Sequence, residues 1–394
     1  METAKRARPR DVYGERRPPP ELPSFPPEII REILLRLPAK SIGRFRCVSK
    51  LFRSLSSDPA FAKTHLDLSL RNDAFPSGRT RLVVNYRHNF YTVGFDSIVH
   101  ACEGIRDLGA VEIPQSPVMS NLVSSCYRKD LWIEMVGSCN GLLCTTNEVA
   151  DVFLFNLTTG ESKRIPGVLE LVNLGSKGGR INGFGFGFDA ITDDYTLVAL
   201  VTGDVLNATV YSVKTDSWKW VRDSRYGYDD MSDDGFLVNG GIHWVARRRE
   251  DGRRVVVAFD LTTEQFKDMA FPDEAEDCCP HAHRVFLLHK LNGRLCMVYG
   301  CFQKHDDFWV MNEYGVASSW ARVRISVSYS NMKPLCSVRN KEETLMKLNG
   351  KLVLYNFRND TFTTLLLKGA KQRNIIVADT YIESLISPNS YDRA

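Results

Sequence analysis

Four potential zinc ligands lie within six consecutive residues, in the run CCPHAH at residues 278–283. Thiolate sulfur and imidazole nitrogen are ligands that zinc prefers, but structural sites usually leave about two to four residues between paired ligands. Two adjacent cysteines followed by a Cys-Pro-His step lack that spacing, and no second ligand pair accompanies them. We therefore expect no metal site, and interpret the run as a loop between repeats on a recognition face.

Three carboxylates form a second candidate, because Asp189, Asp193 and Asp194 could act as the acid and base pair of a glycoside hydrolase. An apolar strand pattern precedes them and another follows at residues 195–198. Thr192 and Asp193 are residue types that close hairpin turns through side chain to backbone hydrogen bonds. We interpret this group as a turn, and expect no catalytic residue here.

A histidine and a glycine series complete the candidates for chemistry. His243 has apolar neighbours and no adjacent Ser, Cys or acid with which to form a nucleophile and base pair. Gly183, Gly185 and Gly187 alternate with aromatic residues, but the helix that a phosphate-binding loop requires does not follow. We expect a structural histidine and glycines that permit close strand packing, with no cofactor.

Residues 22–66 predict a small helical bundle. Pro26 and Pro27 are suited to a first helical turn after Ser24 as a possible cap, and Pro38 ends that helix. A second helix is expected over residues 41–48 and a third over 51–55, while Asp58 precedes a further helix start. The first helix carries apolar residues at helical spacing: Ile29, Ile30, Ile33, Leu34 and Leu37.

This segment has more apolar residues than so short a bundle can bury alone, which predicts a protein partner. It contains eight basic and three acidic residues, a net charge of +5. An acidic partner would be attracted to such a surface.

The composition of the whole chain excludes several classes of protein. A formal charge of only +4 over 394 residues gives no reason to expect a nucleic-acid binder. No apolar run reaches the ~20 residues that cross a bilayer, and the N-terminus is not of the secretory type. Ten cysteines scattered along the chain are typical of a protein whose thiols stay reduced. We expect a soluble protein of the cytoplasm, the nucleus or both.

Residues 1–21 are rich in Arg and Pro, and we expect a disordered tail. Within this tail, residues 5–10 form a basic run, which is either an ordinary solvated segment or a nuclear localisation signal.

Two signals repeat from about residue 80 onward. The first is Asn-Gly beside an apolar stretch, at Asn140, Asn182, Asn239, Asn292 and Asn349, with steps of 42 to 57 residues. The second is a polar turn between two strand-like runs, at Gly160, Asp216, Glu264, Gly315 and Asp360, with steps of 45 to 56 residues. The two series interleave, so each unit of roughly 50 residues predicts two hairpins, as in a propeller blade.

We expect blades at residues 131–165, 183–221, 235–271, 285–325 and 335–368. Two strands within residues 81–95 and one or two within 375–387 remain unassigned, and pairing them would close a ring of six blades. A closed ring leaves no exposed sheet edge of the kind that open repeats carry.

The sequence resembles a plant-type F-box protein with an F-box-associated, kelch-like propeller domain. The first part of the resemblance is in the order and spacing of LP at residues 22–23, EIL at 32–34, LPAKS at 37–41, RFRCVSK at 44–50 and SDPAF at 57–61. The second part is in GSCNGLL at 137–143, GFGFD at 185–189 with TDDY at 192–195, and GGIHW at 240–244. Two departures are Phe52, where the family usually has Trp, and Ser24-Phe25, which replaces a more acidic pair.

The resemblance implies a non-catalytic substrate-recognition subunit of a Skp-cullin-F-box ubiquitin ligase. The F-box would bind the Skp-type adaptor, and through it the cullin and RING subunits, while the propeller would bind an unidentified target protein. It implies that the adaptor is bound by Leu22, Pro23, Ile33, Leu34, Leu37, Pro38, Ile42, Phe45, Val48 and Phe52, with Lys40, Arg44 and Arg46 attracting it. Some of the apolar residues in this set would form the bundle's own core.

We therefore expect an α+β multidomain chain, with a three- to four-helix F-box and an all-β propeller of about six four-stranded blades. The domain boundaries are a tail at 1–21, the F-box at 22–66, a linker at 67–79, the propeller at 80–388 and a tail at 389–394. The basic hairpin at residues 247–254 is either a solvated tip or a contact for an acidic target segment.

Two other functions stay open. One is a propeller that binds or hydrolyses carbohydrate and has a helical cap. The other is an F-box protein that acts as a scaffold outside a ligase.

Overall fold

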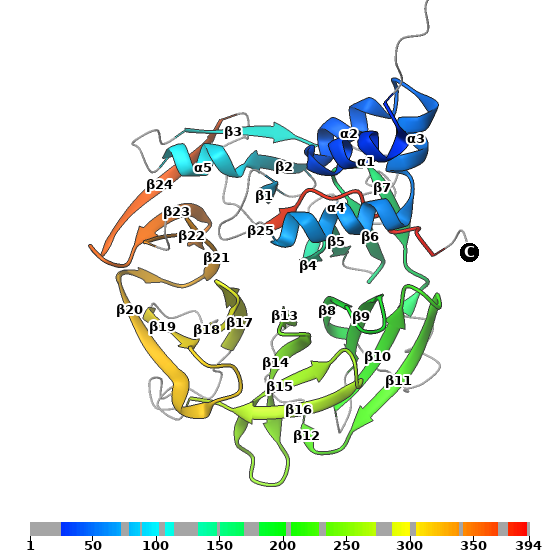
Figure 1. Ribbon diagram of the computed structural model, residues 1–394. Coiled ribbons are helices and arrows are strands. Elements are labelled where there is room, and N and C mark those ends of the chain that lie inside the picture. Colours follow the sequence, from blue (N-terminus) through cyan, green and yellow to red (C-terminus); the bar gives the residue numbers. More distant parts are fainter. Residues whose placement is uncertain are drawn as a thin grey trace, which may run out of the picture.

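Four helices lie on one face of a ring of β-sheets (Figure 1). The computed structural model describes residues 25–71, 79–86, 89–101, 107–113, 133–147, 150–168, 181–201, 206–227, 234–272, 286–299, 305–338, 342–368 and 377–391. Leu22, Pro23 and the CCPHAH run lie outside the described residues. No helix in the described part of the chain has the length and hydrophobicity to span a bilayer.

The helices are α1 (Pro27–Arg36), α2 (Ala39–Phe45), α3 (Lys50–Ser56) and α4 (Pro59–Arg71). The expectation of Ser24 as the first cap was wrong, because Pro26 occupies the N-cap position of α1. Ser49 caps α3, with its hydroxyl accepting from the Phe52 amide at 3.2 Å, and Asp58 accepts from the Ala60 amide at 3.0 Å as α4 begins. The second helix lies earlier than expected, and α4 continues beyond residue 66 into the segment expected to be a linker.

Six four-stranded units form the ring, as expected from the repeats. The first five are β4 (Glu134–Cys139) to β7 (Glu161–Arg164), β8 (Ile181–Asp189) to β11 (Ser217–Asp223), β13 (Phe236–Val238) to β16 (Gln265–Ala270), β17 (Phe286–Leu291) to β20 (Trp320–Tyr329), and β21 (Met332–Val338) to β24 (Thr361–Lys368). Their middle strands are β5 (Leu142–Thr146), β6 (Val152–Asn156), β9 (Asp194–Val201), β10 (Leu206–Ser212), β14 (Gly241–Arg248), β15 (Arg254–Asp260), β18 (Arg294–Tyr299), β19 (His305–Met311), β22 (Glu343–Leu348) and β23 (Lys351–Asn356). The short β12 (Tyr226–Gly227) also pairs with β14.

The sixth blade joins both ends of the propeller sequence. It consists of β25 (Val377–Ile382), β1 (Thr80–Tyr86), β2 (Asn89–Gly94) and β3 (Asp107–Glu112), and α5 (Phe95–Ala101) follows β2. Strand β25 pairs antiparallel with β1, from Thr80 opposite Ile382 to Asn85 opposite Val377. The expected closure of six blades is confirmed. A short parallel pairing of β24 with β3 also joins two blades at their outer edges.

The backbone confirms most of the predicted turns. Asn140-Gly141, Asn239-Gly240, Asn292-Gly293 and Asn349-Gly350 all have positive φ at both positions, as a type I′ turn requires. All five turn positions of the second series also have positive φ. The expected turn at Asn182-Gly183 was wrong: both residues lie in β8, where the register with β9 shifts between Ile181 and Gly183.

Hydrophobic cores fill the space between neighbouring blades. Gly185 and Gly187 lie at one such contact, where an added Cβ would be 2.3 Å from Ile242 Cγ2 and 2.7 Å from Leu261 Cδ1 respectively. Gly185 and Gly187 therefore permit close blade packing, as expected.

The two faces of the ring differ in how strands are connected. Innermost strands run toward the face that carries the helices, where tight turns such as Asn140-Gly141 and Asn292-Gly293 follow them. The long connections, from Glu112 to Glu134, from Arg164 to Ile181 and from Ala270 to Phe286, join strand ends on the opposite face.

Candidate functional site: an exposed helical face and a central channel

The helical bundle has its own core, and one member of that core comes from the far end of the sequence. Leu34, Ile42 and Phe61 are almost completely buried, and Leu385, which follows β25, packs with them. The bundle is thus completed by the segment of residues 383–391, which we call the C-terminal strap.

Hydrogen bonds fix the strap between the helices and the ring. The buried Asn156 side chain on β6 donates to the carbonyl oxygens of Ser384 at 3.0 Å and Ile386 at 2.7 Å. The Tyr391 hydroxyl donates to the Asp193 carbonyl at 2.6 Å, and the Lys63 ammonium lies 2.7 Å from the Asp193 carboxylate. Because buried amide donors are costly to leave unpaired, the Asn156 contacts stabilise the strap against the ring.

Away from the strap, the bundle exposes large apolar side chains to solvent. Their exposed fractions range from 38% to 68%, although side chains of these types are usually buried in small bundles. We call this set the exposed apolar face: Phe25, Ile29, Ile33, Phe45, Val48 and Leu51. Several exposed large apolar side chains on one small bundle are typical of a protein interaction surface.

The same helices and their connections also carry basic side chains. Lys40, Arg44, Lys50 and Arg53 are exposed, whereas Arg46 is half-buried and donates to the Ser57 hydroxyl at 3.2 Å. An acidic partner would therefore meet both apolar side chains and positive charge on the bundle.

The residues predicted to bind an adaptor divide into three groups by burial. Ile33, Pro38, Lys40, Arg44, Phe45 and Val48 are exposed; Leu37, Arg46 and Phe52 are half-buried; and Leu34 and Ile42 belong to the core. The Leu37 carbonyl also lies 2.8 Å from His65 Nε2, so Leu37 contributes to the bundle structure. Phe25, Ile29 and Leu51 also belong to the exposed apolar face, although the adaptor-binding set predicted from the sequence does not include them.

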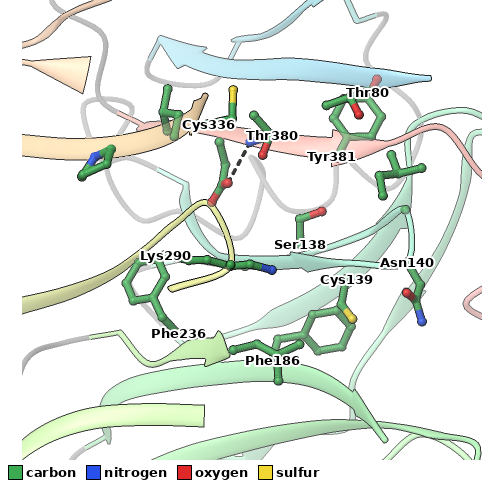
Figure 2. Close-up of a pocket in the computed structure, with 18 of the residues that line it drawn as sticks. Thr80, Ser138, Cys139, Asn140, Phe186, Phe236, Lys290, Cys336, Thr380 and Tyr381 are labelled. Atoms are coloured by element: carbon green, nitrogen blue, oxygen red, sulfur yellow. Dashed lines mark hydrogen bonds between the residues drawn. The ribbon is translucent and has the colours of Figure 1, made fainter. Parts of the chain in front are cut away.

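A cavity of about 610 Å³ follows the axis of the ring. Residues from the innermost strand of every blade line it, and Leu70 of α4 and Thr80 of β1 line it on the helical side. Figure 2 shows Lys290, Phe236 and Ser138 around this central channel.

Lysine provides most of the charge in the channel wall. Lys333 lies 2.9 Å from the Asp379 carboxylate and 5.2 Å from the centre of the Phe236 ring. Lys347 lies opposite Lys333 on β22, outside the cavity lining, and burial, followed by repulsion from Lys333, lowers its pKa to about 8. Burial raises the pKa of the Cys139 and Cys336 thiols to about 12, so both line the channel as neutral groups.

The other candidates for chemistry are occupied by structural contacts. The Asp189 carboxylate accepts from the amides of Ile191 at 3.1 Å and Thr192 at 3.2 Å, which closes the β8–β9 hairpin, and Asp194 accepts from the Lys214 amide at 2.9 Å. In the basic hairpin, Arg248 pairs with Asp251 at 3.1 Å and also with Asp268. Across the described ranges, no group of three or more His, Cys, Asp or Glu residues is arranged to hold a metal ion.

His243 is a buried structural residue, and its burial should make the stability of the fold sensitive to acid. Its ring nitrogens lie 3.1 Å from the Phe236 carbonyl and 2.7 Å from the Tyr314 hydroxyl. Burial lowers the pKa of His243 to about 4, from about 6.5 in an unfolded chain. The unfolded state therefore binds more protons between these values, and the free energy of unfolding should decrease, by roughly 1–3 kcal/mol, as pH falls from about 6.5 to about 4.

Urea unfolding across this pH range checks that prediction. His243→Gln should reduce the slope, whereas His100→Gln, at an exposed position of α5, should leave it unchanged. Equal slopes for the wild type and His243→Gln would contradict it. The burial of His65, His289 and His305 lowers their pKa values as well, so part of the slope should remain.

Comparison with known proteins agrees with both structural parts of the chain. The family model of the F-box domain matches residues 22–64, and that of the F-box associated beta propeller domain matches residues 82–387. F-box protein CPR1 of Arabidopsis thaliana is 28% identical over 382 residues, which cover 88% of this chain and 85% of that protein. F-box/kelch-repeat protein At3g23880 of the same plant is 26% identical over 378 residues, covering 93% of this chain and 96% of that protein.

Among solved structures, TolB from Acinetobacter baumannii aligns with a TM-score of 0.42 and 10% identity, over 84% of this chain and 73% of that one, a likeness too low to bear on function. The two family matches lie on the helical bundle and on the ring, and together they account for most of the chain. The chain therefore belongs to the F-box proteins that carry an F-box associated beta propeller domain.

Proposed function

We propose that this F-box protein is the substrate-recognition subunit of a Skp-cullin-F-box ubiquitin ligase in the cytoplasm or the nucleus. The exposed apolar face binds the Skp-type adaptor, which connects the protein to the cullin and RING subunits. The propeller binds a target protein, and the assembly raises the effective concentration of the target's lysines near the conjugating enzyme. The protein itself makes and breaks no bond.

The observation that supports this proposal most is the division of the bundle into two sides. One side packs on the strap through Leu34, Ile42 and Phe61, and the other leaves Ile33 and Val48 in solvent. A helical cap that served only to stabilise the propeller would need the first side alone. The exposed apolar and basic side chains of the bundle fit an acidic helical partner.

Target recognition is expected on the face of the ring opposite the helices. The strand ends that the long connections join lie on that face, and in repeat folds connecting loops carry binding residues on a rigid scaffold. Adaptor and target would then occupy opposite faces of the propeller without competing for space.

Capture by an adaptor tests the proposal. The double variant Ile33→Asp, Val48→Asp should lose at least about 100-fold in affinity for a plant Skp-type adaptor, because two charges would be placed in an apolar contact. Both side chains are about half or more exposed, so folding should be preserved. Val111→Asp is a matched control, since Val111 is 57% exposed on β3, in the propeller.

Binding can be measured by calorimetry with the full chain. Failure of the wild type to bind the adaptor, or full binding by the double variant, would refute the docking surface. Binding of the adaptor without ubiquitination of any captured protein would instead support a scaffold outside a ligase.

A further inference from the structure

One lysine in the central channel has no acidic partner among the described residues. Lys290 is exposed near the end of β17, which leads to the face that carries the helices. Figure 2 shows its side chain extending into the channel toward β4, near Ser138 and Cys139. No ion pair or hydrogen bond joins the Lys290 ammonium to any described side chain, so its charge is available to a ligand.

The other groups of the wall leave this positive charge unbalanced. Asp379, a carboxylate that lines the channel, is already paired with Lys333 at 2.9 Å. Asp234 precedes β13 and so lies toward the opposite end of the channel. The two lining cysteines are neutral thiols, and burial raises the pKa of Tyr381 as well. Among the described lining residues, Lys290 and Lys333 therefore outnumber the single carboxylate of Asp379.

Neutral hydrogen-bonding groups lie around the same end of the channel. The Asn292 amide oxygen accepts from the Ser337 backbone amide at 3.1 Å, which leaves the Asn292 amide nitrogen as a donor. Ser138, Asn140 and Thr380 also line the cavity. Oriented donors around an ammonium group are the usual means by which proteins bind carboxylate or phosphate groups.

The size and position of the cavity favour a compact ligand. A volume of about 610 Å³ falls within the range of small-molecule sites. Leu70 of α4 lines the opening on the helical side, so the protein's own helix occupies space that a folded partner would need.

We propose that the helical end of the central channel is a binding site for a small organic anion with several carboxylate or phosphate groups, held by the Lys290 ammonium. The site is separate from the exposed apolar face and does not depend on the proposed ligase function. Its ligand contacts α4 through Leu70, β1 through Thr80 and the innermost strands, and therefore joins the bundle to the ring.

Citrate and inorganic pyrophosphate serve as probes, because they separate carboxylate from phosphate recognition. Binding to the full chain is measured by calorimetry at constant ionic strength, and the increase in Tm is a second readout. At least one probe should bind the wild type, and Lys290→Gln should weaken that binding about tenfold or more, as expected for loss of a charge-assisted hydrogen bond.

Lys351→Gln is the matched control, since Lys351 is an exposed lysine that begins β23 at the Asn349-Gly350 turn, outside the cavity lining. It should bind the probe as the wild type does, and both variants should keep the wild-type Tm without ligand. Absence of binding by the wild type to both probes would overturn the site. Equal affinities of Lys290→Gln and the wild type would do the same.

Discussion

Gly141→Ala is expected to be among the most destabilising single substitutions in the propeller. Gly141 has φ of +84°, and an added Cβ would lie 2.2 Å from Ser384 Oγ and 2.6 Å from the Ile382 carbonyl oxygen. Left-handed backbone strain contributes about 1–2 kcal/mol, and displacement of the packed strap contributes a further 1–3 kcal/mol or so. We expect a loss of roughly 2–5 kcal/mol in the free energy of unfolding, at the strand that closes the ring.

Gly240→Ala separates these two contributions. Gly240 occupies the equivalent turn of another blade with φ of +74°, but no atom lies within 4 Å of an added Cβ. In this variant only the backbone strain should lower the free energy of unfolding, by about 1–2 kcal/mol. Urea unfolding of the full chain measures both variants, and equal losses would show that ring closure does not depend on the Gly141 contact.

Leu385→Ala is expected to loosen the F-box although Leu385 is remote from it in sequence. Truncating an almost completely buried leucine usually costs about 2–5 kcal/mol, depending on how far the site can collapse. The cavity would form among Leu34, Ile42 and Phe61, so the effect should be concentrated in the helices. Amide hydrogen exchange in α1 and α4 should accelerate, while exchange in β8–β11 should stay slow.

Leu366→Ala is the control for this prediction, because Leu366 is 45% exposed on β24. It should change the free energy of unfolding by no more than about 0.5 kcal/mol. Uniform acceleration of exchange in both bundle and ring by Leu385→Ala would show that the strap acts on the whole fold instead.

Much of the propeller could be predicted because turn chemistry is local. A positive φ at Asn292-Gly293 or at Asp216 depends on a few neighbouring residues, so the turns gave blade boundaries close to the observed strands. Asn182-Gly183 shows the limit, since the same dipeptide also fits a strand whose register shifts beside a packed neighbouring blade.

Other features depend on contacts that no period in the sequence reports. The extension of α4 beyond residue 66 is stabilised by packing of Leu68 against the bundle core. The sequence also has no Gly or Pro that would end the helix before Pro76. The different burial of the neighbours Ile33 and Leu34 follows from where the strap packs, which helical spacing alone does not determine. The strap contacts, such as Asn156 with Ser384, join residues more than 200 positions apart.

The order in which the chain is synthesised gives the strap a second consequence. Domains generally fold as units, and the N-terminal domain of a chain folds first during synthesis. Here the first helices need Leu385 to complete their core, and β1 needs β25 to complete its sheet. A chain whose synthesis stopped before β25 would expose both an unfinished bundle and an open strand edge. The core of the F-box is therefore complete only when residues from both ends of the chain have packed together.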